Sequence, residues 1–163
     1  MSLCRPGIVR WGRLALLLQL ALIVPGVVTA QHSVAHKWNE ALLDAIREDF
    51  ARPTVHARNL FHTSVALYDA WAAYDQDATP YLLGSTIRGF ACPFTGVPVP
   101  ADVQEARQEA LSYAAYRLLM HRFELSPGNV ASQASFDSLM AALGYDASFR
   151  FDRICRRTAR GTG

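Results

Sequence analysis

Lysine is almost absent from this sequence: Lys37 is the single lysine among 163 residues, and arginine supplies every other basic side chain apart from histidine. Cysteine is scarce too, and three cysteines cannot make a disulfide framework. The sequence lacks a Gly-x-Ser-x-Gly nucleophile elbow and a glycine-rich phosphate loop at the start of any predicted helix. These absences leave no familiar nucleophile and no nucleotide site.

The longest apolar run lies near the N-terminus, from Leu14 to Val28. Three arginines precede it, and the small residues that end at Ala30 form a typical cleavage site. The run is interrupted by Pro25 and is shorter than the ~20 residues that a membrane-spanning helix needs. We therefore predict a signal peptide over residues 1–30 and an exported mature chain, periplasmic or extracellular, without a stable membrane span.

Cleavage there would leave a nearly neutral chain. Such a chain lacks the excess of basic residues that is typical of nucleic-acid-binding proteins. Cleavage would also leave only Cys92 and Cys155, which could pair in an oxidising compartment or stay unpaired. Residues 150–163 hold five of the sixteen Lys and Arg residues and show no apolar periodicity. They are interpreted either as a flexible basic tail or as the product of a frameshift or truncation.

Apolar periodicity predicts an all-α fold, an incomplete bundle of about four helices over residues 31–149. Ser33 should cap the first helix and Pro53 should begin the second. The second should be the most buried, because apolar side chains cover more than half of its circumference. The stretch with many prolines and glycines is predicted as an irregular connection rather than a strand pair. The predicted helices span about 33–50, 53–74, 101–123 and 135–143, and the connection spans 75–100.

The residues that share one face of a predicted helix allow further predictions for three of these helices. The first helix should bury one stripe as far as Phe50, and Gly144 should end the fourth. In the third, Ala106, Ala110 and Ala114 should allow a close helix neighbour. The residues expected to point inward from the fourth helix are Phe136, Leu139, Met140 and Leu143.

A narrow polar line of Arg58, His62 and Asp69 runs down the second predicted helix. His62 and Asp69 are about 10 Å apart along the axis, which is too far for a direct acid–base relay. Each of the three is therefore expected to pair with a neighbouring helix or loop. His56 and His62 point about 120° apart and do not have the spacing of zinc ligands. We assign no catalytic, cofactor-binding or metal-binding residue.

Several segments nevertheless resemble the N-terminal helical part of bacterial vanadium-dependent haloperoxidase-like proteins. The likeness extends over about residues 34–149 and includes Cys92-Pro-Phe. The other segments that carry it are Trp38-Asn-Glu-Ala-Leu-Leu-Asp-Ala-Ile-Arg47, Arg52-Pro-Thr-Val-His-Ala-Arg-Asn-Leu-Phe-His-Thr-Ser64, Tyr68-Asp-Ala-Trp-Ala-Ala-Tyr-Asp75, Ala110-Leu-Ser-Tyr-Ala-Ala-Tyr-Arg-Leu-Leu119 and Ser135-Phe-Asp-Ser-Leu-Met-Ala-Ala-Leu-Gly-Tyr-Asp146.

This resemblance implies the all-α fold of the phosphatidic acid phosphatase type 2 and haloperoxidase superfamily, whose site holds vanadate or phosphate. The family's site uses a lysine with six residues between it and an Arg-Pro, a Ser-Gly-His, and a Ser-Arg followed by a His and an Asp. Here Ala45 occupies the lysine position before Arg52-Pro53, and the other motifs are missing. No vanadate-binding residue can be transferred to this chain.

We therefore expect this chain to be a truncated, inactive N-terminal fragment of a secreted haloperoxidase-like protein. The full-length parent would be an oxidoreductase, a peroxidase that uses vanadate and peroxide to oxidise halide. Its partner would be the missing C-terminal half or another copy of the chain. The alternatives are a small helical extracytoplasmic binding or interaction module and a fragment of a phosphatase from the same superfamily. The halide and the oligomeric state do not follow from the sequence.

Overall fold

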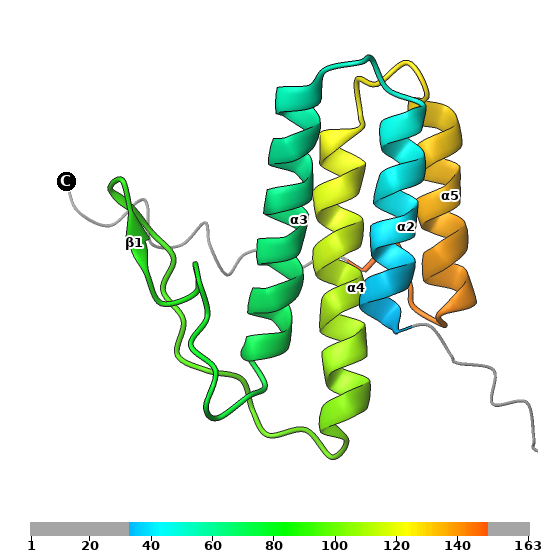
Figure 1. The fold of residues 1–163 in the computed structure, drawn as a ribbon. Coiled ribbons are helices and arrows are strands. Elements are labelled where there is room, and N and C mark those ends of the chain that lie inside the picture. Colours follow the sequence, from blue (N-terminus) through cyan, green and yellow to red (C-terminus); the bar gives the residue numbers. More distant parts are fainter. Residues whose placement is uncertain (1–32, 150–163) are drawn as a thin grey trace, which may run out of the picture. The chain divides into compact units, whose positions relative to one another are not determined.

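The computed structural model describes residues 33–149, which contain four α-helices and one short hairpin (Figure 1). The predicted all-α fold is thereby confirmed. Within this described part, no helix is long and apolar enough to cross a membrane. The predicted signal peptide (1–30), the basic tail (150–163) and Cys155 lie outside the described residues. The elements are α2 (Val34–Arg47), α3 (Pro53–Ala72), β1 (Thr86–Ile87), β2 (Phe90–Ala91), α4 (Val103–Arg122) and α5 (Asn129–Ala142).

The first two helices begin where the sequence predicts. The Ser33 hydroxyl accepts a 3.2 Å hydrogen bond from the His36 amide and caps α2. Pro53 occupies the first turn of α3, where its missing N–H costs nothing. However, α2 ends at Arg47, and Phe50 is 59% exposed instead of extending the buried stripe. The prediction for Phe50 was wrong because residues 48–52 form the turn into α3.

The other two helices differ in how well their starts were predicted. The Asp102 carboxylate accepts hydrogen bonds from the second and third amides of α4, close to the predicted start. By contrast, α5 begins six residues before the predicted Ser135, and no side chain caps it. It ends at Ala142, and the predicted Gly144, with a φ of +82°, follows the cap residue Leu143. The amides of Gly144 and Tyr145 bond back to the carbonyls of Ala141 and Met140, which is a Schellman ending.

The connection between α3 and α4 contains a strand pair, which corrects the prediction that it has none. Thr86 pairs with Ala91 and Ile87 with Phe90 in an antiparallel hairpin. The two turn residues, Arg88 and Gly89, both have positive φ, as a two-residue hairpin turn of type I′ requires. The pair is only two residues long on each side, so the fold class is unchanged.

The hydrophobic core is built almost entirely by α2, α4 and α5. From α3 it receives only Leu67 among the described residues. Trp38 of α2 meets Tyr116 of α4 edge to face, and Phe136 and Met140 point inward from α5 as predicted, with Leu139 and Leu143 packed against them. The buried core residues are Val34, Trp38, Ala41, Leu42, Ala45, Leu67, Tyr113, Ala115, Tyr116, Leu119, Phe123, Phe136 and Met140.

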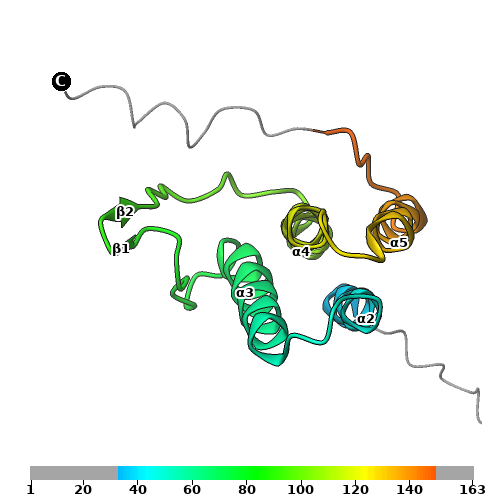
Figure 2. The same cartoon turned by 90° about the horizontal axis from the view of Figure 1, so that it is seen from above.

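Helix α4 lies at the centre of this arrangement and packs against α2, α3 and α5 (Figure 2). Its closest partner is α3, which agrees with the prediction that Ala106, Ala110 and Ala114 allow a close helix neighbour. Helix α3 makes no contact with α5, so one of its sides has no helix beside it in the described part of the chain. The prediction that this second helix is the most buried was therefore wrong, because it has too few partners.

Candidate functional site

The polar stretch Arg52–Ser64 begins in the turn between α2 and α3, where its first residues fix the backbone. Arg52 bonds the Asp49 carboxylate at 3.1 and 3.2 Å, and the ring of His56 lies 2.8 Å from the Phe50 carbonyl. The pKa of Asp49 is lowered despite its burial, because the Phe50 amide, the Ser126 hydroxyl and Arg52 all favour the carboxylate. His56, in the first turn of α3, thus binds back to the turn before the helix, and the structure does not bring it together with His62.

Asp69, the last residue of the polar line, holds the loop after α3. Its side chain is buried, with 6% of the residue exposed, and its carboxylate accepts three backbone hydrogen bonds. The donors are the amides of Tyr81, Leu82 and Leu83. A carboxylate with three amide donors is a well-satisfied buried acceptor. Asp69 therefore positions a loop and has no contact with His62.

Arg58 and His62 belong to a different environment, one that faces α4. The guanidinium of Arg122, at the end of α4, contacts Nδ1 of His62, and Arg58 lies one turn before His62 on α3. The pKa of His62 is lowered, first by burial and then by the positive charges of Arg122 and Arg58. The predicted line is therefore split into Arg58 and His62, which face α4, and a separate carboxylate, Asp69, which holds the loop.

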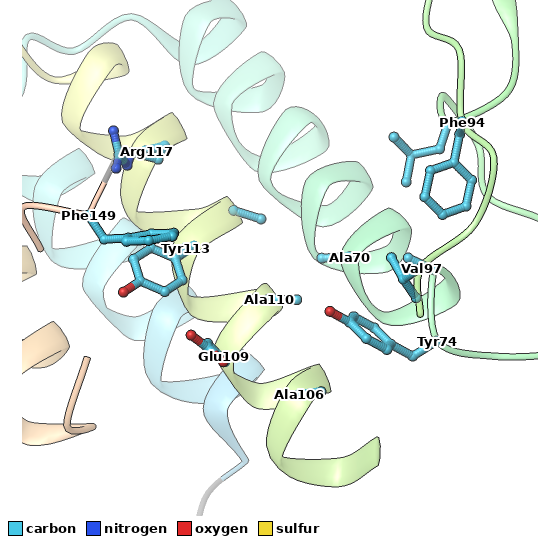
Figure 3. Close-up of a pocket in the computed structure, with 13 residues that line it drawn as sticks. Ala70, Tyr74, Phe94, Val97, Ala106, Glu109, Ala110, Tyr113, Arg117 and Phe149 are labelled. Carbon is cyan, nitrogen blue, oxygen red and sulfur yellow. The ribbon is translucent and has the colours of Figure 1, made fainter. Parts of the chain in front are cut away.

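The larger of two apolar grooves lies between the end of α3, the following loop and α4, with a volume of about 570 Å³ (Figure 3). We call it the Ala70 groove. In Figure 3, Ala70, Ala106 and Ala110 form its helical wall, with Tyr74 and Phe94 on one side and Tyr113 on the other. Its lining residues are Ala70, Ala73, Tyr74, Leu83, Phe94, Val97, Ala106, Glu109, Ala110, Tyr113, Ala114, Arg117 and Phe149.

The charged groups of the Ala70 groove do not form a reactive set. Glu109 and Arg117 are both on α4, about 12 Å apart along its axis. Nearby, Tyr113 donates a 3.0 Å hydrogen bond to the Asp146 carbonyl. Burial raises the pKa of Tyr145, and Glu109 adds to the effect. A raised tyrosine pKa keeps the phenol protonated, so it is a poor base at neutral pH.

Arg107 joins α4 to the end of α3 beside this groove. Its guanidinium bonds the Asp75 carboxylate at 2.7 Å and the Tyr74 carbonyl at 3.1 Å, and lies 4.7 Å from the ring centroid of Trp71. The pKa of Asp75 is lowered by the amides of Asp77 and Ala78 and, further, by Arg107. This group ties α4 to the end of α3, and the buried Nε of Arg107 is left without a hydrogen-bond partner among the described residues.

The second groove, of about 420 Å³, has His62 in its wall and is called the His62 groove. Arg122 contacts His62, and Arg58 lies one turn before it on α3. Residues of α3, of the hairpin loop and of α4 form it. Apart from His62 and the Tyr81 ring, its walls are aliphatic or phenyl side chains. The lining residues are Phe61, His62, Val65, Ala66, Tyr81, Leu82, Ile87 and Leu118.

Neither groove fits a metal or vanadate site. Within residues 33–149, no group of three or more His, Cys, Asp or Glu side chains could hold a metal ion. A vanadate site needs enclosed cationic donors around one oxyanion. Arg107 is occupied by Asp75, and Arg58 and Arg122 are both exposed. No catalytic step through vanadate can be derived from these residues.

Sequence reasoning missed the polar contacts that Arg107 and Arg122 of α4 make with residues in and after α3. Basic residues at the end of a helix are expected from the helix dipole alone, so the sequence carried no signal for the contact of Arg122 with His62. The spacing of Arg107 from Trp71 and Asp75, more than thirty residues along the chain, left no local signal. The loop residues Tyr81 and Ile87 were missed because the 75–100 stretch gave no periodic pattern.

No family model matches this chain, and neither a curated protein nor a solved structure is similar enough to it to show a family.

Proposed function

We propose that residues 33–149 are the non-catalytic N-terminal scaffold of a secreted vanadium-dependent haloperoxidase-like bundle, and that this part alone does not oxidise halide. The sequence segments that resemble that family support the proposal.

The observation that carries the proposal is the inverted burial of α3. Asn59 and Thr63 are buried polar residues of this helix, with 3% and 1% exposed, whereas Phe61 is 54% exposed. Leu60, Tyr68 and Trp71 are also exposed on α3. A surface helix normally does the opposite and turns its apolar stripe to the core. An exposed apolar face of this kind is typical of a surface that other helices cover in a larger bundle.

Two measurements test the scaffold proposal. With vanadate, bromide and peroxide, we expect no halogenation of a phenol dye above the rate without protein, and robust turnover would overturn the proposal. Translating the genomic DNA beyond codon 150 in the other two forward frames should reveal Ser-Gly-His and Ser-Arg segments. If neither frame encodes them, the proposal that the chain is a truncated or frameshifted fragment fails.

The exposed face can be tested separately by substitution. Leu60→Gln should lower the fluorescence of a bound apolar dye and reduce self-association, with a change in unfolding free energy within about 0.5 kcal/mol. The matched control is Leu119→Gln, since Leu119 is completely buried in the core and its substitution should unfold the protein. If Leu60→Gln destabilises as Leu119→Gln does, Leu60 is not on an open face.

A second candidate, a small helical extracytoplasmic binding module, is favoured by the two apolar grooves. Their volumes, about 570 and 420 Å³, lie in the range of small-molecule sites. A binding module should unfold cooperatively as a stable monomer or oligomer, whereas a scaffold without its partner should bind apolar dyes and aggregate. Calorimetry together with light scattering separates the two.

A further inference from the structure

One group of positive charges in the described residues lacks a counter-charge. Arg58 and His62 lie one turn apart on α3, and Arg122 reaches them from α4 to contact His62. Among residues 33–149, no carboxylate forms an ion pair with Arg58 or Arg122. The effect on His62 is visible in its lowered pKa, to which both arginines contribute after burial. Both guanidinium groups act on the same imidazole, so an anion beside His62 would be attracted by both.

The charged group stands at an apolar groove. His62 is itself part of the groove wall, between Phe61 and Val65 of α3. Ala66 and Leu118 line the part between the helices, and Ile87 and Leu82 come from the hairpin loop. A ligand that lay in this groove would therefore bury an apolar body and present its end to two guanidinium groups and an imidazole.

We propose that the His62 groove binds a single-chain fatty carboxylate, with the alkyl chain along Val65, Ala66 and Leu118 and the carboxylate on Arg58 and Arg122. Charge complementarity selects the head group, because a guanidinium binds a carboxylate through two parallel hydrogen bonds. The groove walls select an alkyl chain, because they offer almost no hydrogen-bonding groups. This site is independent of the haloperoxidase proposal and would stand if that proposal failed.

The test uses octanoate and the full chain, with binding followed by titration calorimetry and by NMR of the His62 ring. Two probes are the controls: octyltrimethylammonium has the same chain with the opposite charge, and acetate has the charge without the chain. We expect saturable binding of octanoate alone, weaker at high salt. Bound octanoate should raise the pKa of His62, because a neighbouring negative charge favours the imidazolium.

Variants locate the site. Arg58→Gln and Arg122→Gln should each weaken octanoate binding about tenfold, which corresponds to the loss of a charge-assisted hydrogen bond. Arg117→Gln is the matched control, since it removes the same charge from α4 at the Ala70 groove and should leave the affinity unchanged. Both test arginines are exposed, so the variants should keep their circular dichroism spectra. Equal binding of octanoate and octyltrimethylammonium, or octanoate affinities that the Arg58 and Arg122 substitutions leave unchanged, would overturn the proposal.

Discussion

The carboxylate of Asp69 on α3 accepts a 2.8 Å hydrogen bond from the backbone amide of Leu82, thirteen residues further along the chain. The amides of Tyr81 and Leu83 bond the same carboxylate. A buried side chain of the helix thus replaces the backbone partners that an irregular segment lacks. This pairing brings the loop over α3 and places Tyr81 and Leu82 in the wall of the His62 groove.

Asp69→Asn should release this loop. An amide oxygen is a weaker acceptor than a carboxylate and its NH₂ group cannot accept, so we expect a loss of about 1–2 kcal/mol in unfolding free energy. Faster hydrogen exchange at the amides of residues 81–83 should accompany it. Asp77→Asn is the control, because Asp77 is exposed in the same loop. Equal effects of the two substitutions would contradict the role given to Asp69.

Gly128→Ala should destabilise the junction between α2 and α5. A Cβ atom at Gly128 would stand 2.5 Å from Cβ of Glu48 and 2.9 Å from its carbonyl oxygen, and backbone atoms there cannot easily move. We expect a cost of about 1–3 kcal/mol in urea unfolding. In a Glu48→Gly background the cost should fall, since one of the two clashes is gone, and a double-mutant cycle measures this coupling.

Arg107→Gln should loosen the end of α3 from α4. The variant loses the ion pair with Asp75 and the contact over the Trp71 ring, and we expect a loss of about 1–3 kcal/mol in thermal unfolding. The stability of the Arg107→Lys variant should lie between those of the original chain and the Arg107→Gln variant, because an ammonium keeps the charge but not the planar fork of the guanidinium. Arg117→Gln is the charge-matched control and should leave the stability within about 0.5 kcal/mol. A lysine variant as unstable as the glutamine variant would show that charge has no part in the contact.

The protonation of His62 should make the stability depend on pH. Its pKa is lower in the folded chain than the ordinary value, so the unfolded chain binds the proton more readily. Neutral His62 therefore contributes fully to the free energy of unfolding above the pKa of about 6.5 that His62 has in the unfolded chain. That contribution is lost as the pH falls through the pKa of His62 in the folded chain. The charged and titratable groups around His62 are Arg58 on α3, Arg122 on α4 and Tyr81 on the loop.

The check is an NMR titration of His62 alongside urea unfolding between pH 5 and 8. Arg122→Gln should raise the pKa of His62 and reduce the loss of stability in acid, because one of its repelling charges is gone. Carboxylates whose pKa is lowered, such as that of Asp49, titrate below this window. An unchanged His62 pKa in the Arg122 variant would contradict the electrostatic part of this explanation.

Local signals predicted the helices well and their environments poorly. Ser33, Pro53 and Gly144 each act through the backbone within one turn, so the sequence is sufficient to place them. The start of α5 was missed because Gly128 offers no capping side chain. The hairpin was missed because the X-Gly pair at Arg88 and Gly89 is a weak signal beside so many prolines and glycines.

The burial of α3 could not be predicted at all from its own residues. Apolar density around a helix says which faces could be covered, but the number of neighbours depends on the whole fold. Similarly, the polar line of α3 was predicted to need partners, but which partners it has depends on the path of the loop and on the end of α4. Long-range contacts such as Arg122 with His62 leave no mark in local spacing.

The scarcity of α3 residues in the core has a consequence for the order in which the chain opens. Since α2, α4 and α5 share one apolar interior and α3 contributes only Leu67 to it, α3 and its loop can detach while most of that interior stays packed. The chain should therefore contain two units of different local stability. Amides of α3 should exchange through a partial opening well below the global unfolding free energy, while those around Leu119 and Phe136 exchange only when the whole chain unfolds.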